Sequence, residues 1–99
     1  METTNIRQEI NYKGFNNEYW KMLVTFDNEI TVICNGEKRT YKLNDIVHIE
    51  HDNDYVTITH PDNSFTQIKF ELDNFLVIDL FDADSEYIET IGSYVFGEI

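Results

Sequence analysis

Hydrophobic and polar residues alternate in short runs that recur about every ten residues along this chain. The runs are rich in β-branched and aromatic residues, and Asn, Asp, Gly, Pro and Ser separate them. The predicted strands are Ile6–Tyr12, Tyr19–Phe26, Glu29–Cys34, Lys38–Leu43, Ile46–His51, Tyr55–His60, Phe65–Leu72, Phe75–Phe81 and Tyr87–Phe96. We therefore expect a mainly β fold, an antiparallel barrel or sandwich of about seven to nine short strands.

The pair Asn35-Gly36 predicts a tight hairpin. Both central positions of a type I′ turn need positive φ, which Asn and Gly adopt readily. A two-residue turn here pairs Val32 with Arg39 and Ile30 with Tyr41.

The register of the following hairpin can be tested by asking whether the numbers of opposed residues add to an odd or an even number. Val47 and Ile49 lie on its first strand, and Val56 and Ile58 lie on its second. All four share one face only if the numbers of opposed residues add to an odd number, because a slip of one residue turns a strand over. A two-residue turn at positions 52–53, or a four-residue loop over positions 51–54, meets this condition.

Alternation also predicts which side chains are mostly buried. These are Val24, Val32, Val47, Ile49, Val56, Ile58, Ile68, Phe70, Ile78 and Leu80. The run Phe75–Phe81 is apolar on both sides except at Asp79, which is typical of a strand with neighbours on both sides in its sheet.

The last stretch allows two interpretations. Tyr87, Ile88 and Ile91 fit helical spacing, with Ser85 as a possible N-cap. The same β-branched and aromatic residues suit a strand, and Gly92 disfavours a helix interior. We favour the strand, with a short C-terminal helix closing a barrel as the alternative.

Composition indicates one folded domain, residues 1–99, because 41% of the residues are hydrophobic and 14% aromatic. The single cysteine, Cys34, excludes an internal disulfide and fits a reducing compartment. The first residues lack the charged and apolar regions of a classical secretion signal. No apolar run approaches the roughly 20 residues needed to cross a bilayer. We expect a cytoplasmic protein.

Charge separates sharply between the two halves of the chain. Residues 1–49 carry six basic and seven acidic side chains, whereas residues 50–99 carry one and twelve, the single cation being Lys69. Crowded like charges destabilise a compact state, so this density suggests that the acidic surface meets a cationic partner. The same charge argues against binding of nucleic acid or anionic membrane, which requires Lys and Arg.

The candidate partner-binding residues are carboxylates in or beside predicted turns, which we expect to project into solvent with little structural duty. They are Asp52, Asp54, Asp62, Asp82, Asp84 and Glu86.

No catalytic, metal or cofactor motif accompanies this charge. The predicted hairpin sets His51 and His60 roughly 15–20 Å apart, too far to share a metal ion, and puts His48 on the other face. Cys34 lies on the expected inward face, where a thiol is inert. The glycines form no phosphate-binding loop. We expect neither enzyme activity nor a cofactor.

The stretch 36–76 resembles the LytTR DNA-binding domain. The rhythm D-I-x-x-I-E-x-x-x-x-Y-V-x-I matches Asp45, Ile46, Ile49, Glu50, Tyr55, Val56 and Ile58. The basic segment that should follow is replaced by Ile78-Asp79-Leu80-Phe81-Asp82, so the residues for DNA binding are missing. In strand pattern the whole chain is also similar to bacterial pleckstrin-homology-like domains, small antiparallel β folds with a capping C-terminal helix.

Two functions fit these features. The first is an acidic inhibitor or immunity-type protein that binds a basic partner, such as a nuclease, a toxin or another nucleic-acid-binding enzyme. The second is a pleckstrin-homology-like adaptor or oligomerisation module that binds a peptide or protein at a sheet edge. Carboxylates gathered on one face favour the first, and an even spread favours the second.

Overall fold

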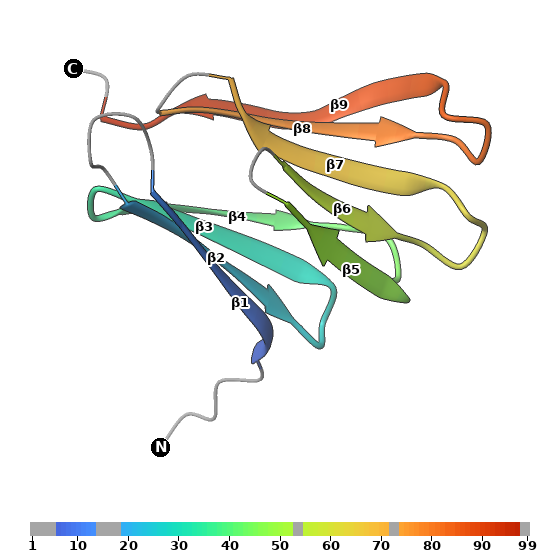
Figure 1. The fold of residues 1–99 in the computed structure, drawn as a ribbon, viewed down its shortest axis with the longest axis horizontal. Helices are drawn as coiled ribbons and strands as arrows, with labels where there is room; N and C mark the ends of the chain where they lie inside the picture. Colours follow the sequence, from blue (N-terminus) through green and yellow to red (C-terminus); the bar gives the residue numbers. More distant parts are fainter. Residues whose placement is uncertain (1–5, 14–18, 53–54, 72–73, 98–99) are drawn as a thin grey trace. The chain divides into compact units, whose positions relative to one another are not determined.

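A computed structural model describes residues 6–13, 19–52, 55–71 and 74–97. These residues form nine strands in two antiparallel sheets and contain no helix (Figure 1). The mainly β expectation is confirmed. The chain divides after Leu43 into two units, residues 1–43 and 44–99, and each holds one sheet.

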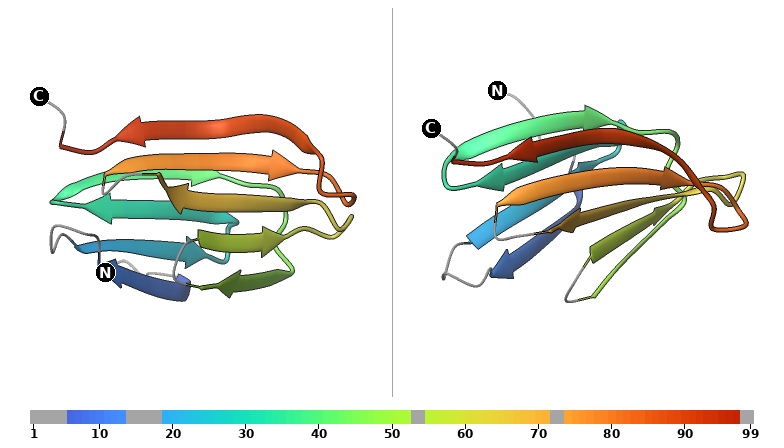
Figure 2. Two further views of the ribbon diagram at one scale, coloured as in Figure 1. Left: turned by 45° about the horizontal axis from the view of Figure 1, so that its top comes forward. Right: turned by 90° about the horizontal axis from the view of Figure 1, so that it is seen from above.

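The first unit is a meander in chain order (Figures 1 and 2). Its strands are β1 (Ile6–Lys13), β2 (Tyr19–Thr25), β3 (Glu29–Cys34) and β4 (Glu37–Lys42). The β3–β4 register pairs Val32 with Arg39 and Ile30 with Tyr41, as Asn35-Gly36 predicts. Both turn residues have positive φ, 52° for Asn35 and 84° for Gly36.

The inward face of this sheet follows the alternation in the sequence. Along β3, Ile30, Val32 and Cys34 are fully buried, while the residues between them are half-buried. Met22 and Val24 of β2 are fully buried as well. Cys34 is therefore a buried thiol outside any disulfide, and burial in apolar surroundings keeps a thiol unreactive.

The second unit is a five-stranded meander, also in chain order (Figures 1 and 2). Its strands are β5 (His48–His51), β6 (Tyr55–Thr59), β7 (Phe65–Phe70), β8 (Phe75–Phe81) and β9 (Tyr87–Val95). Strand β8 pairs with β7 and β9, as its two apolar sides predict. Its residues Leu76, Val77 and Ile78 are buried in succession.

The β5–β6 hairpin has the predicted parity but not the predicted register. Ile49 lies opposite Ile58, and the Asp52 N–H donates to the Tyr55 carbonyl at 3.1 Å. Either predicted turn would instead place Ile49 opposite Val56, so the predicted register is wrong by two residues although its parity holds. Asn53 itself lies outside the described residues.

The burial prediction is wrong for Val47. Six of the ten residues expected to be mostly buried are buried, three are half-buried, and Val47 is 55% exposed. Strand β5 begins only at His48 and is an edge strand, so the alternation does not extend back to Val47. Ile46, which precedes it, is buried instead.

The C-terminal stretch is a strand, as the sequence favoured. The β8–β9 register shifts twice, leaving Ile88 and Ile91 without a direct partner on β8. Each shift inserts an extra residue and breaks the two-residue alternation. These irregularities explain why the apolar residues of β9 repeat at the three-residue spacing of a helix.

Candidate protein-interaction surface

The β6–β7 turn is built on the buried side chain of His60, which is 1% exposed. Its Nδ1 lies 2.6 Å from the Asp45 carbonyl oxygen, and its Nε2 lies 2.6 Å from Thr66 Oγ1. A carbonyl can only accept, so the neutral ring carries its proton on Nδ1, and the Thr66 hydroxyl donates to Nε2. This bridge ties the start of the turn to β7 and to the segment before β5.

Asp62 holds the same turn from its exposed side. Its Oδ1 accepts from the Ser64 hydroxyl at 2.5 Å and from the Ser64 N–H at 3.0 Å. Both donors favour the ionised form, so the Ser64 hydroxyl first and the Ser64 N–H second lower the pKa of Asp62. At neutral pH the carboxylate is charged and held in one position.

Asp82 organises the β8–β9 turn in a similar way. Its Oδ1 accepts from the N–H groups of Asp84 at 2.9 Å and Glu86 at 3.0 Å. Ser85 takes a positive φ of 67° and donates its N–H to the Asp82 carbonyl. The backbone under Asp84 and Glu86 is therefore fixed, while both of their side chains are exposed.

The expectation that the candidate carboxylates contribute little to the structure is wrong for three of them. Asp62 and Asp82 fix turns, and Asp52 Oδ1 accepts from the Tyr55 N–H at 3.1 Å. Asp and Asn are frequent at turns because their side chains replace missing backbone bonds there. Asp82 is also half-buried rather than projecting freely.

The structure does not bring all the candidates together. Strand direction alternates in a meander, so the β6–β7 and β8–β9 turns share one end of the sheet, as Figures 1 and 2 show. Asp52 lies at the other end, about 20 Å away at 3.3 Å per residue along the six residues of β7. Asp54 lies outside the described residues. We call Asp62, Asp82, Asp84 and Glu86 the acidic end.

The acidic end lacks counter-charges within its own unit. Lys69, the last but one residue of β7, is the only Lys or Arg among the described residues from 44 to 97. Neither Asp84 nor Glu86, nor Glu89 on β9, makes an ion pair with any residue that the structure describes. These carboxylates are therefore available to a cation from outside the chain.

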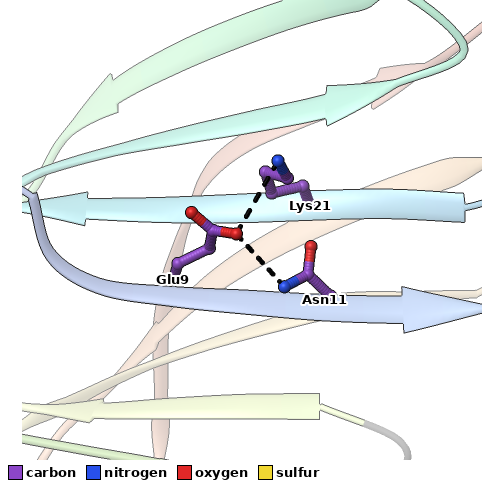
Figure 3. A network of polar contacts seen from close by, with 3 residues as sticks. All are labelled: Glu9, Asn11 and Lys21. Carbon is purple, nitrogen blue, oxygen red and sulfur yellow. Dashed lines mark hydrogen bonds and ion pairs between the residues drawn. The ribbon is translucent and has the colours of Figure 1, made fainter.

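The first unit shows the contrasting arrangement. On its exposed surface the Lys21 ammonium lies 3.7 Å from Glu9 Oε2, which also accepts from the Asn11 amide at 3.3 Å (Figure 3). Here acidic and basic side chains face each other across β1 and β2. The negative field of the chain therefore comes mainly from the second unit.

His51 and His60 lie apart along the β5–β6 hairpin, but less far than predicted. His51 is opposite Val56, four residues before His60, which corresponds to about 13 Å along the strand rather than roughly 15–20 Å. Both ring nitrogens of His60 have hydrogen-bond partners. His48 lies 3.8 Å from Glu50. Among the described residues, no three His, Cys, Asp or Glu side chains are grouped to hold a metal ion.

A small hollow lies at the end opposite the acidic end. Its volume is about 210 Å³, and its lining is Glu50, His51, Asp52, Tyr55 and Thr57. Ligand pockets are typically about 300–1,000 Å³ and mainly apolar. This open, polar hollow does not match such a pocket.

Sequence reasoning missed the exposed start of β9. Tyr87 is 59% and Ile88 48% exposed, and Glu89 and Thr90 beside them are exposed too. Tyr87 packs edge-on against Phe81, with ring centroids 6.2 Å apart, and its hydroxyl lies 2.9 Å from Thr90 Oγ1. The signal for it in the sequence is the apolar run next to an acidic turn, a pattern that equally fits the packing of a strand or a helix.

The described part of the chain contains no helix able to span a membrane. Comparison with known protein families, with curated protein sequences and with solved structures finds no match to this chain.

Proposed function

We propose that this protein is a non-catalytic acidic binding domain of the inhibitor or immunity type, acting in the cytoplasm. Its partner is a basic protein, such as a nuclease, a toxin or another nucleic-acid-binding enzyme. The acidic end is the main contact surface. The observation that supports this is a pair of turns whose backbone is fixed by buried or hydrogen-bonded side chains. On the second of these turns, Asp84 and Glu86 are exposed and make no ion pair with the described residues.

Preorganisation makes this arrangement suitable for binding. Ordering side chains and loops at an interface costs about 0.5–1.5 kcal/mol for each flexible side chain. The bonds from Asp62 to Ser64 and from Asp82 to Glu86 place part of this cost in folding. The net charge of −12 would also steer a cationic protein toward the domain and raise the association rate at low salt.

The second candidate function is the adaptor that binds at a sheet edge. The regular part of β9, from Gly92 to Val95, favours it, because β9 is an edge strand of the second sheet. An edge strand can accept an extended segment of another protein by strand addition. The two candidates differ in what carries the affinity, carboxylates in the first and backbone groups in the second.

The test of the first candidate is capture of basic proteins as a function of salt. The informative variant is Asp84→Asn with Glu86→Gln, which leaves the turn-forming Asp82 in place. The matched control is Glu50→Gln with Glu71→Gln, which removes the same charge at the other end of the sheet. We expect capture to weaken as salt rises, mainly through slower association, and to fall in the first variant but not in the control.

Two results would contradict the proposal. Capture that does not depend on salt would leave the charge as a solubility feature and favour the adaptor function. An equal fall in both variants would show that only total charge matters, not the acidic end.

A further inference from the structure

Strand β9 has one long edge without a neighbour in its sheet. The sheet order ends at β9, which pairs only with β8 over Tyr87–Val95. Exposed edge strands are the places where another chain can add a strand. β9 leads directly out of the acidic end, because its first residue follows Glu86.

The register shows which backbone groups of β9 point to that edge. The Phe96 N–H donates to the Asn74 carbonyl, so this opposed pair is hydrogen-bonded. Bonded and non-bonded pairs alternate along an antiparallel ladder. Tyr94 and Gly92 therefore bond to β8, whereas Ser93 and Val95 direct their N–H and C=O groups away from it.

The two halves of β9 differ in their capacity to accept a strand. The shifts at Ile88 and Ile91 interrupt the first half, and bulges and charges on an edge oppose unselective pairing. The register from Gly92 to Val95 is regular. A strand can therefore pair along Gly92–Val95 and continue past the exposed carboxylates of Glu89 and Glu86.

We propose that β9 receives an extended segment of the basic partner, paired at Ser93 and Val95, with Lys or Arg side chains reaching Glu86 and Glu89. This rests on the proposed function and names its binding mode. The carboxylates supply the charge-dependent affinity and select a cationic segment over an acidic one, while backbone bonds along the edge add to that affinity and set the register of the segment. Exposed Tyr87 and Ile88 provide apolar contact beside the charges.

The first test needs no variant. An octapeptide that alternates Lys and Val is added to the full chain, and amide hydrogen exchange is followed by NMR. In the free protein we expect the Ser93 and Val95 amides to exchange faster than those of Gly92 and Tyr94. The peptide should protect Ser93 and Val95, and the same peptide with Glu in place of Lys should not. Protection elsewhere, or none, overturns the proposal.

The second test blocks the edge. Proline is tolerated on an edge strand where the N–H faces outward, so Ser93→Pro should fold and lose one docking bond. We expect it to weaken peptide binding about tenfold, while the control Ser93→Ala binds like the unmodified chain. Equal binding by both variants overturns the edge site.

The outcomes separate this inference from the proposed function. If Asp84→Asn with Glu86→Gln weakens binding but Ser93→Pro does not, the acidic end stands and the edge site fails. If neither change weakens binding, the proposed function fails too. A second copy is the other possible occupant, since β4 carries exposed Lys38 and Arg39. If sedimentation shows a dimer of the unmodified chain and a monomer of Ser93→Pro, the proposal is overturned in favour of self-association.

Discussion

The buried bridge between His60 and Thr66 should make a measurable contribution to stability. Thr66→Val keeps the shape of the side chain and its preference for strands but removes the hydroxyl that donates to His60 Nε2. Thr66 is fully buried and His60 is 1% exposed, so water cannot replace the lost donor. Leaving one buried polar atom unsatisfied costs about 1–3 kcal/mol. We expect a loss in this range.

Urea denaturation followed by circular dichroism measures this loss as a lower midpoint with an unchanged slope. For a chain of this length, each kcal/mol also lowers the melting temperature by roughly 4–8 °C. The matched control is Thr57→Val on the neighbouring strand, a half-buried position, which should change stability by about 0.5 kcal/mol or less.

A second readout checks the cause. Nitrogen NMR of the imidazole should show the neutral His60 ring protonated at Nδ1, because the Asp45 carbonyl can only accept. If Thr66→Val costs no more than Thr57→Val, or if the ring carries its proton on Nε2, the bridge does not support the turn in the way described.

Three further predictions test the fold and the turns. Ile58→Ala should cost roughly 2–5 kcal/mol because Ile58 is fully buried, and Thr57→Ala about 0.5 kcal/mol or less; equal losses in urea would mean that both faces of β6 are packed alike. Gly36→Ala should cost about 1–2 kcal/mol through its positive φ alone, since no atom lies within 4 Å of an added Cβ; an unchanged urea midpoint would contradict the turn geometry. The pKa of Asp62 is lowered, so its ionised form stabilises the fold at pH values above its ordinary pKa, and this stabilisation is lost as the pH falls through the lowered pKa. Ser64→Ala should raise the pKa of Asp62 measured by carboxyl NMR. An unchanged pKa would exclude the Ser64 hydroxyl as the main cause of the lowering.

The sequence by itself determined the strands and their tight turns. Strand positions depend on alternation and on turn residues, both local properties of the chain. The Asn35-Gly36 turn set the β3–β4 register because only certain residues adopt positive φ, and parity gave the shared face of Ile49 and Ile58. The burial of Ile58 and Val32 followed from the same alternation.

Only the tertiary structure decided which turns and side chains that are distant in the sequence lie at the same end of a sheet. The alternating direction of a meander placed the turns of Asp62 and Asp82 at one end and Asp52 at the other, which no local signal contains. The bridge from His60 to Thr66 likewise depends on two strands pairing in one register. The structural role of the turn aspartates was missed because an exposed carboxylate and one bonded to nearby N–H groups look the same in sequence. Charge is a property of composition, whereas its distribution over a surface is a property of strand order and register.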